Sequence, residues 1–225
     1  MKHALHKRMT VLALTLLFCV GAMPRALAAE RIGDFRDLSP GAWYAQGVRY
    51  CVKNELMSGY GNVNHLFNPD GLMNRAELVT ILWRMEGAPI TGLAMHYDDV
   101  PEDEWYADAV RWAMIEGVMV GNTPMTFSPE RVVTREQLAL ALWRYAEYRN
   151  GFAAEIDDPE YETYRDHDRV SKEAEKAMRW ANAMGIITGT KDSDGSYVLT
   201  PWAQVSRAAA ATILMRFCLD MGIYD

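Results

Sequence analysis

The stretch FSPERVVTREQ, residues 127–137, decides the fold of this chain. The same pattern occurs twice more, as FNPDGLMNRAE at residues 67–77 and as LTPWAQVSRAA at residues 199–209. Each copy has an aromatic residue or leucine first, a proline two positions later and an arginine eight positions later. Recurrence at identical offsets in three places indicates an internal repeat.

A second pattern lies upstream of each copy. Asp37 precedes Trp43 by six positions, and Asp99 precedes Trp105 by the same interval. A third, looser copy begins near Asp166 and lacks the Trp-Tyr pair. The two patterns together predict three repeats, at residues 35–88, 97–150 and 164–218, with a linker at residues 151–163.

Each repeat is predicted to form two helices around a loop. In the second repeat, apolar side chains recur with helical spacing over residues 105–116. The second helix of each repeat follows a residue that is a good N-cap, namely Asn74, Thr134 or Ser206. The first two caps have a Glu or Gln three positions later and predict capping boxes, whereas the third has an alanine there. Because no long alternating segment occurs, we expect an all-α fold with a shared core.

The N-terminus is predicted to be a signal peptide, residues 1–28. A basic start precedes an apolar run over residues 9–23, and Ala26-Leu27-Ala28 fits a cleavage site. An uncleaved anchor helix is the alternative; once cleaved, the chain is not expected to be an integral membrane protein. The full chain of 225 residues has a net charge of −7, and removal of residues 1–28 leaves 19 basic against 30 acidic residues, or −11. This acidity argues against nucleic-acid binding.

Two cysteines lie beyond the predicted signal peptide, Cys51 and Cys218. Cysteine is among the residues that are most often buried, so two buried free thiols are one interpretation. In an exported, oxidising setting, a disulfide that joins the first and last helices is the other.

Three arginines directly follow the N-caps: Arg75, Arg135 and Arg207. A cation in the first turn opposes the helix dipole, so folding does not require it there. We predict that each arginine and the free helix N–H groups bind a carboxylate or phosphate, with a salt bridge to a neighbouring repeat's Asp as the alternative. Nine positions further on, a second set points to the opposite helix face and is interpreted as solvated: Arg84, Arg144 and Arg216.

Repeated aromatic and acidic residues are the other candidates. Trp43 and Trp105 precede the first helices and either stack on sugar rings or pack in the core. Core packing is favoured for Trp83 and Trp143. The aspartates Asp37, Asp99 and Asp166 are interpreted as caps of the first helices, or as groups that orient an arginine.

The sequence predicts no catalytic activity, cofactor or metal site. Paired histidines, a CxxC motif, a nucleophile elbow and a P-loop are all missing from the sequence. Residues 192–195 hint at a calcium loop but lack the later glutamate, so we interpret them as a polar turn.

These motifs together resemble the S-layer homology domain family. The second repeat matches best, since Val133-Thr134-Arg135-Glu136 is close to the family's Ile-Thr-Arg-Ala-Glu motif. The resemblance covers nearly all of the chain beyond residue 28. It implies a pseudo-threefold, three-lobed trimer of helix-loop-helix repeats with a central helical bundle and grooves between the lobes.

The resemblance also implies a function: non-covalent cell-wall anchoring of a secreted, cell-surface protein through secondary cell-wall polysaccharide, often with pyruvylated sugars. The ketal carboxylate would meet the motif arginine. The ligand residues expected on this basis are Arg75, Arg135 and Arg207. Trp43, Trp105, Asp37 and Asp99 complete the expected set on their own residue types and spacing. Because the third repeat departs most from the motif, its groove is expected to be degenerate. A small envelope or S-layer subunit that binds copies of itself or other envelope proteins is the alternative.

Overall fold

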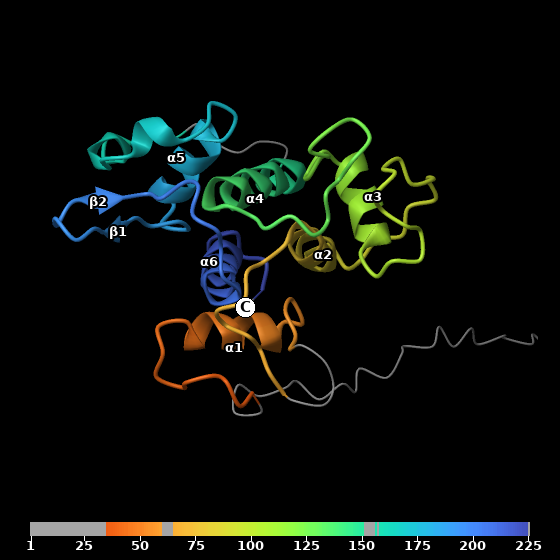
Figure 1. The fold of residues 1–225 in the computed structure, drawn as a ribbon, viewed down its shortest axis with the longest axis horizontal. Coiled ribbons are helices and arrows are strands. Elements are labelled where there is room, and N and C mark those ends of the chain that lie inside the picture. The colour runs from red at the N-terminus through yellow and green to blue at the C-terminus, as the bar shows by residue number, and fades with distance from the viewer. Residues whose placement is uncertain (1–34, 60–64, 151–155, 157, 225) are drawn as a thin grey trace, which may run out of the picture.

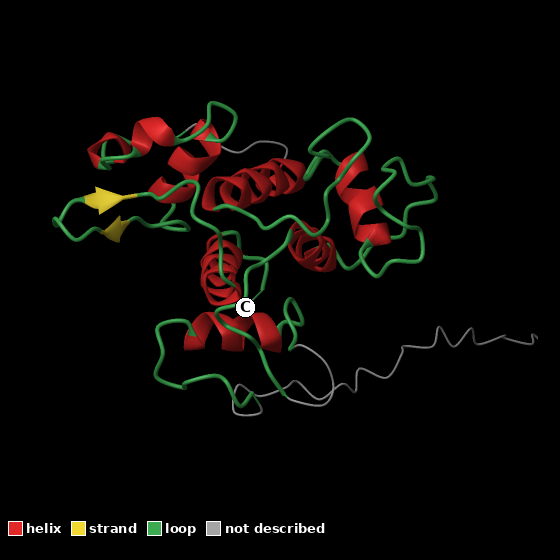
Figure 2. Ribbon diagram, in the orientation of Figure 1, coloured by secondary structure: helices red, strands yellow, loops and turns green. Residues whose placement is uncertain are grey.

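The computed structural model describes residues 35–59, 65–150, 156 and 158–224 (Figure 1). The predicted signal peptide and part of the predicted linker lie outside these residues. The prediction of an all-α fold is confirmed, since helices dominate the described chain (Figure 2). The α-helices are α1 (Ala45–Lys53), α2 (Arg75–Met85), α3 (Ala107–Ile115), α4 (Arg135–Asn150), α5 (Glu175–Ala183) and α6 (Arg207–Asp220).

The helices pair across repeats. The first helix of each repeat packs against the second helix of the preceding repeat, α3 on α2 and α5 on α4, and α1 closes the series by packing on α6. In Figure 1, α2, α4 and α6 lie in the middle, and α1, α3 and α5 lie outside them. A lobe therefore combines two repeats, which the helix-loop-helix interpretation of each repeat did not foresee.

A closed cycle of backbone hydrogen bonds joins the three segments that lead into these central helices. The Met73 amide donates to the Val205 carbonyl (2.9 Å), the Val205 amide to the Val133 carbonyl (3.0 Å), and the Val133 amide to the Met73 carbonyl (2.9 Å). Three equivalent contacts that close on themselves are what a pseudo-threefold arrangement of the repeats would produce. The cycle thus supports that prediction.

The caps of the central helices follow the local sequence. Asn74 and Glu77 form the predicted capping box, and Thr134 and Gln137 exchange the equivalent pair of hydrogen bonds. The Ser206 side chain accepts from the amide at the N3 position without a reciprocal bond, as predicted for this cap.

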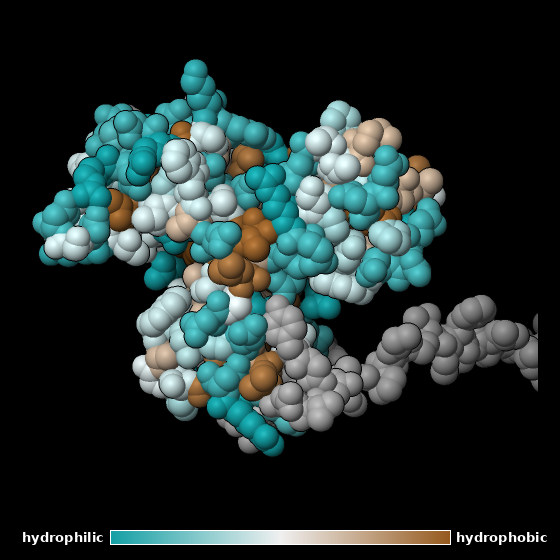
Figure 3. Space-filling view, viewed as in Figure 1, coloured by the Kyte–Doolittle hydropathy of each residue, from teal (hydrophilic) through white to brown (hydrophobic). Residues whose placement is uncertain are grey.

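The core is aromatic where the helices of different repeats meet. The ring centroid of Tyr145 in α4 lies 5.9 Å from that of Phe217 in α6 and 6.4 Å from that of Trp112 in α3. The ring centroid of Trp180 in α5 lies 6.2 Å from that of Phe217. All four side chains are buried. Figure 3 shows a largely hydrophilic surface on one face, with apolar residues gathered near the middle, where the three arms meet. Trp83 and Trp143 pack partly buried against this core, as predicted.

The two cysteines are free and buried, which confirms the first of the two interpretations. Cys51 lies in α1 and Cys218 in α6, so both belong to the contact between the first and last repeats. The Cys51 thiol donates to the Ala211 carbonyl at 3.4 Å.

Short elements complete the third repeat. Two 3₁₀ turns, η2 (Tyr161–Thr163) and η3 (His167–Arg169), precede α5, and a small hairpin pairs β1 (Thr190–Lys191) with β2 (Tyr197–Val198). Residues 192–195 form the turn of this hairpin, as the polar-turn interpretation predicts. Within the described ranges, no helix combines the length and apolar character needed to cross a membrane.

Candidate functional site: grooves between the repeats

Arg75 crosses from its own repeat into the next. Its Nε donates to the Phe127 carbonyl at 2.9 Å, and its Nη2 donates to the Val120 carbonyl at 2.6 Å. The guanidinium carbon lies 4.4 Å from the centre of the Phe127 ring. Only 7% of the residue is exposed. Arg75 is therefore a fixed cation at the boundary between two repeats.

The other two motif arginines repeat this geometry around the cycle. Arg135 donates to the carbonyls of Leu199 and Thr188, both at 2.9 Å. Arg207 donates to the carbonyls of Phe67 (3.0 Å) and Ser58 (2.6 Å). These acceptors occupy matching positions in the three repeats. Each guanidinium is held by two backbone carbonyls of the next repeat. A salt bridge to a neighbouring repeat, weighed as the alternative role, occurs at Arg207, whose Nη1 donates to Glu77 of the first repeat at 2.7 Å, with a Glu in place of the expected Asp.

The aspartates act on the loops that receive these arginines. The Asp99 carboxylate accepts from the amides of Phe127 (2.8 Å) and Ser128 (2.7 Å). Asp37 accepts in the same way from the amides at residues 67 and 68, and Asp166 from those at residues 199 and 200. The interpretation of these aspartates as helix caps is wrong, because the N-caps of α1, α3 and α5 are later residues whose side chains make no capping hydrogen bond.

The aspartates do orient the arginines, through the loop. The Phe127 amide donates to Asp99, while the carbonyl of the same residue accepts from Arg75. The negative charge of Asp99 also acts on Arg75 through space and raises its pKa, against a larger lowering by burial. The hydrogen bonds therefore favour the second interpretation of these aspartates, in which they orient an arginine.

The N–H groups at the starts of the central helices are already used. The amides of Arg75 and Ala76 donate to the carbonyls of Arg131 and Pro129 at 3.0 and 2.9 Å. The first turn of α4 makes the equivalent bonds to the loop at Pro201 in the third repeat. The first turn of α6 makes them to the loop at Pro69 in the first repeat. The expectation that free helix N–H groups bind the anion is therefore wrong, because the next repeat takes these donors.

Because the helix N–H groups are already bonded, the guanidinium groups are the remaining candidates for binding an anion. Burial, and to a lesser extent the nearby charge of Arg131, lowers the pKa of Arg75 to about 10. Burial likewise lowers the pKa of Arg135. Arg75 nevertheless stays protonated at neutral pH, because its pKa lies well above 7.

A cavity of about 190 Å³ opens beside Arg75. Its wall includes residues 118–122 of the second repeat together with Gln137 and Arg144 of α4. No described residue accepts a hydrogen bond from Nη1 of Arg75, the guanidinium nitrogen that remains. The cavity thus combines a buried cation with an open face.

The sequence analysis missed Arg144 as a site residue. Arg144 does lie far from Arg135 on the same helix, but the cavity joins Arg144 to Arg75, which comes from another helix. Nη2 of Arg144 pairs with the Glu173 carboxylate at 2.8 Å. The third repeat shows the same juxtaposition, since Arg216 donates to the Thr188 hydroxyl (3.3 Å) and Arg135 to the Thr188 carbonyl. The signal in the sequence was the recurrence of an arginine nine positions after each motif arginine, at Arg84, Arg144 and Arg216.

Trp43 and Trp105 are exposed, by 68% and 56%, so the core-packing interpretation of these two residues is wrong. Each ring stands edge-on to the following tyrosine, with centroid distances of 5.4 and 5.2 Å. Both lie outside the wall of the cavity beside Arg75. Their open faces remain available to an apolar surface, and the structure does not bring them to the arginine.

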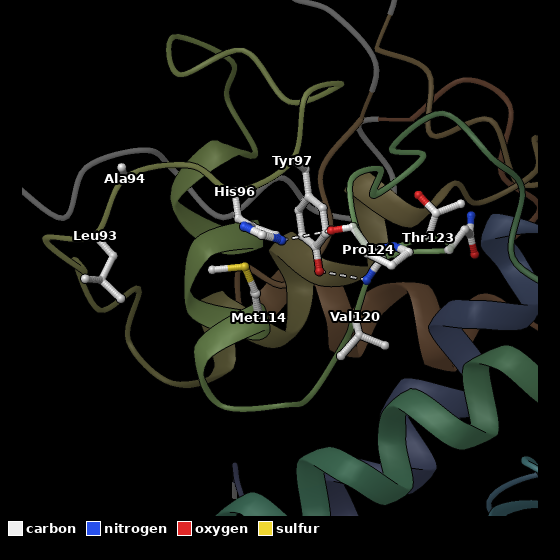
Figure 4. A pocket seen from close by; sticks show the side chains of 10 residues that line it. Leu93, Ala94, His96, Tyr97, Met114, Val120, Thr123 and Pro124 are labelled. Atoms are coloured by element: carbon white, nitrogen blue, oxygen red, sulfur yellow. Dashed lines mark hydrogen bonds between the residues drawn. The ribbon is translucent and has the colours of Figure 1, made fainter.

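A second, larger hollow of about 700 Å³ lies on the other side of residues 120–122 (Figure 4). His96 and Tyr97 turn toward the loop that carries Thr123 and Pro124, where Tyr97 accepts from the Gly121 amide (2.8 Å) and the His96 ring lies 2.8 Å from the Pro124 carbonyl. The apolar side chains of Leu93, Met114 and Val120 also face this hollow.

Comparison with known proteins finds one family. The model of the S-layer homology domain matches three segments, residues 34–79, 96–139 and 163–211, which amount to more than half of the chain. All three motif arginines lie within the matched segments.

Several curated proteins are similar over much of this chain. The Surface-layer 125 kDa protein of Lysinibacillus sphaericus is 25% identical over 202 residues, which cover 90% of this chain and 16% of that protein. The Cellulosome-anchoring protein of Acetivibrio thermocellus is 23% identical over 67% of this chain and 33% of its own length. An Endoglucanase of Bacillus sp. (strain KSM-635) is 24% identical over 70% of this chain and 16% of its own length. The chain thus spans only a sixth to a third of these relatives.

Proposed function

Because the chain belongs to the S-layer homology domain family, we propose that it anchors to the cell wall by binding an anionic wall polysaccharide between its repeats. The family and its S-layer and cell-wall relatives indicate a location at the cell wall or the cell surface. The ligand is a secondary cell-wall polysaccharide whose carboxylate, such as a pyruvate ketal, meets Arg75. The proposal assigns no catalysis to the chain.

One observation carries the proposal: Arg75 and Gln137, each with a donor that has no acceptor among the described residues, both line this cavity. Nη1 of Arg75 has no acceptor among the described residues. The Gln137 Oε1 accepts from the Thr134 amide at 3.1 Å, which leaves the Nε2 amide as the free polar end of that side chain. Both residues line the cavity, so an acceptor such as a carboxylate bound there can satisfy these donors.

The overall charge makes this local arrangement necessary. The chain carries 30 acidic against 23 basic residues, so long-range attraction does not bring an anionic polymer to it. A buried guanidinium interacts with a carboxylate in a medium of lower dielectric constant than water. Affinity therefore depends on the few arginines in the grooves, and raised salt is expected to weaken binding only moderately.

The exposed tryptophans supply the second part of the proposal. Trp43 and Trp105 present open ring faces on which the C–H faces of sugar rings can stack. Asp37 and Asp99 then act indirectly, because both carboxylate oxygens of each already accept loop amides. Arg135 and Arg207 are the equivalent arginines of the other two grooves.

The experiment compares two arginines of α4 in a pull-down with isolated cell-wall sacculi. Arg144 lines the cavity, and its ion pair with Glu173 of the third repeat is partly exposed, so Arg144→Gln tests the groove without breaking the Arg75 bonds. Arg149→Gln is the matched control, because Arg149 pairs with Glu86 outside the cavity wall. We expect Arg144→Gln to weaken binding about tenfold, the effect of a lost interaction of about 1.4 kcal/mol. Arg149→Gln should bind like the unchanged chain.

The polysaccharide requirement is tested with the same sacculi after chemical extraction of the wall polymer. Binding that survives this extraction, and that Arg144→Gln and a double Arg75→Ala, Arg135→Ala variant leave unchanged, overturns the proposal. Circular dichroism of each variant separates a lost site from a lost fold.

Self-association is the second candidate function, and one observation favours it. Ile90, Leu93 and Met125 are exposed by 85%, 58% and 48%, and Leu93 belongs to the large hollow in the second repeat. Exposed apolar side chains that form a patch are typical of protein contacts. Light scattering that rises with concentration, and falls in an Ile90→Ser, Leu93→Ser variant, would support this role; a monomer at all concentrations would exclude it.

A further inference from the structure

Residues 90–95 connect the first repeat to the second. Their backbone amides and carbonyls make no hydrogen bond to another described residue, and the Thr91 hydroxyl has no partner in the described chain either. Ile90 and Leu93 are exposed by 85% and 58%, and Gly92 and Ala94 are exposed as well. The segment is therefore largely exposed, and no hydrogen bond of its own holds it to the described fold.

Two side-chain contacts hold the chain on either side of this segment. Nε1 of Trp83 in α2 donates to the Pro89 carbonyl at 2.9 Å. The His96 ring lies 2.8 Å from the Pro124 carbonyl. The six residues between these two points span up to about 20 Å when they are fully extended.

The segment also borders the large hollow of the second repeat. Leu93 and Ala94 lie on one side of this hollow, and Val120 and Thr123 lie on the other (Figure 4). A molecule that approaches residues 90–95 therefore finds open space on the solvent side and also on the side of the hollow.

Another exposed loop of the same repeat is bonded more tightly. Met125 is 48% exposed, but its carbonyl accepts from the Asp98 amide at 2.9 Å. The Thr123 hydroxyl accepts from the amides of Met125 and Thr126 at 3.3 and 3.0 Å. This loop has to open before it can extend, whereas residues 90–95 do not.

We infer that residues 90–95 form a cleavage site for an endopeptidase that binds an extended chain and prefers apolar side chains, and that the cleaved protein stays assembled. Exposed loops are preferred sites of proteolytic cleavage. An extended peptide is held by its main-chain hydrogen bonds and by pockets for its side chains. Residues 90–95 offer free backbone groups together with the exposed side chains of Ile90 and Leu93. This site goes beyond wall binding and does not depend on it.

The chemical step is hydrolysis, for example between Gly92 and Leu93. The C–N bond of the peptide breaks. One water molecule supplies the hydroxyl group that completes the carboxyl group of Gly92 and the hydrogen that completes the amino group of Leu93. No oxidant or reductant takes part.

The two parts of the cleaved protein hold each other through contacts that do not involve residues 90–95. The first repeat contacts the second through α2 on α3 and through the bonds of Arg75 to the second repeat. It contacts the third through α1 on α6 and through the bonds of Arg207 to the first repeat. The cleaved protein is therefore a folded complex of two chains.

The site is tested by limited digestion with thermolysin, an endopeptidase that cuts before apolar residues. The protein is kept dilute, so that copies do not cover each other, and mass spectrometry identifies each cut. We expect cleavage within residues 90–95 to be at least about tenfold faster than cleavage before Met125, which corresponds to an opening cost of about 1.4 kcal/mol at the bonded loop.

Two variants serve as matched controls. Ile90→Ser, Leu93→Ser removes the exposed apolar side chains and should slow cleavage of the segment about tenfold, with an unchanged circular dichroism spectrum. Thr123→Ala removes the hydroxyl that holds the other loop and should speed up cleavage before Met125. Variants that are cut at the same rates as the unchanged chain would contradict the stated basis of the site.

Gel filtration and native mass spectrometry test whether the cleaved protein stays assembled. In native buffer, the cleaved protein should elute with the uncleaved chain and be heavier by one water molecule, and denaturant should separate the two fragments. Fragments that separate in native buffer would overturn the two-chain complex. Absence of cuts within residues 90–95, or equally fast cutting before Met125, would overturn the cleavage site, and each of these results leaves the wall-binding proposal standing.

Discussion

The amide of Met73 donates to the carbonyl of Val205 at 2.9 Å, although Met73 belongs to the first repeat and Val205 to the last. Helices of the same two repeats also meet, because α1 of the first repeat packs on α6 of the last. The two ends of the described chain therefore support each other directly. Changes at this junction are expected to affect the whole fold, and local changes elsewhere only one groove.

The backbones of α1 and α6 approach closely at Gly47. A Cβ at this position would lie 2.7 Å from the Cα of Thr212 in α6, so a side chain there forces the two backbones apart. We expect Gly47→Ala to lower the free energy of unfolding by about 1–3 kcal/mol, in spite of the better helix propensity of alanine. Urea unfolding followed by circular dichroism measures this change.

The matched control is Gly41→Ala. This glycine is exposed, and an added Cβ would meet nothing within 4 Å. Its substitution should change stability by less than about 0.5 kcal/mol. Equal stabilities for the two variants would contradict the close packing of α1 on α6.

The role of Asp99 is tested against its neighbour. Asp99 holds the amides of Phe127 and Ser128, and the Phe127 carbonyl holds Arg75. Asp99→Asn replaces an ionised acceptor and should cost about 1–3 kcal/mol of stability. Asp98→Asn, at an exposed residue, should cost almost nothing. Sacculus binding should weaken in the first variant, which moves the loop around Arg75, and an unchanged affinity there would show that the loop does not position the arginine.

Tyr145 links two of the central helices. Its hydroxyl donates to the Glu86 carboxylate at the end of α2 at 2.6 Å, and Arg149 donates to the same oxygen at 2.7 Å. Tyr145→Phe should lower the free energy of unfolding by about 1.5–3 kcal/mol, because the lost hydrogen bond involves a charged acceptor. Tyr148→Phe on the same helix is the control, since its ring is partly exposed. Thermal melts that do not distinguish the two variants would exclude this link.

The buried thiols predict a loss of stability in alkali. Burial raises the pKa of Cys218 to about 12 and also raises the pKa of Cys51. In the unfolded chain, a thiol ionises near pH 8.5. The unfolded state therefore binds fewer protons above this pH, and the free energy of unfolding should fall as pH rises from about 8.5 toward 12.

The expected slope is about 1.4 kcal/mol per pH unit for each thiol. Urea unfolding between pH 8 and pH 10 measures it, and Cys218→Ala should remove the contribution of one thiol. Ellman's reagent should react with Cys51 and Cys218 only after denaturant is added. Fast reaction in the folded chain would show that these residues are accessible.

Local chemistry made part of this structure predictable. The caps at Asn74, Thr134 and Ser206 could be identified because a side chain that caps a helix bonds within three residues. Arg75 was noticeable because a cation in the first helical turn has no local reason to be there. The helices followed from apolar spacing, which reports one face of one element.

The remaining features depend on contacts between repeats, which spacing does not specify. Apolar periodicity shows that α1 has a buried face but does not show that α6 covers it. For the same reason, Arg144 was assigned to the solvent, since its distance from Arg135 along α4 says nothing about Arg75. Asp99 was interpreted as a cap because its true partners, the amides near Phe127, lie on a distant loop.

The pairing of α1 with α6 also sets the order in which the chain can fold. During synthesis, the residues that line the buried face of α1, Val48, Cys51 and Val52, are made long before their partners in α6. Helix α3 finds α2 already present, and α5 finds α4, whereas α1 has to wait for the last helix. The fold therefore cannot grow steadily from its N-terminal end; it closes in one late step, when residues 207–220 become available.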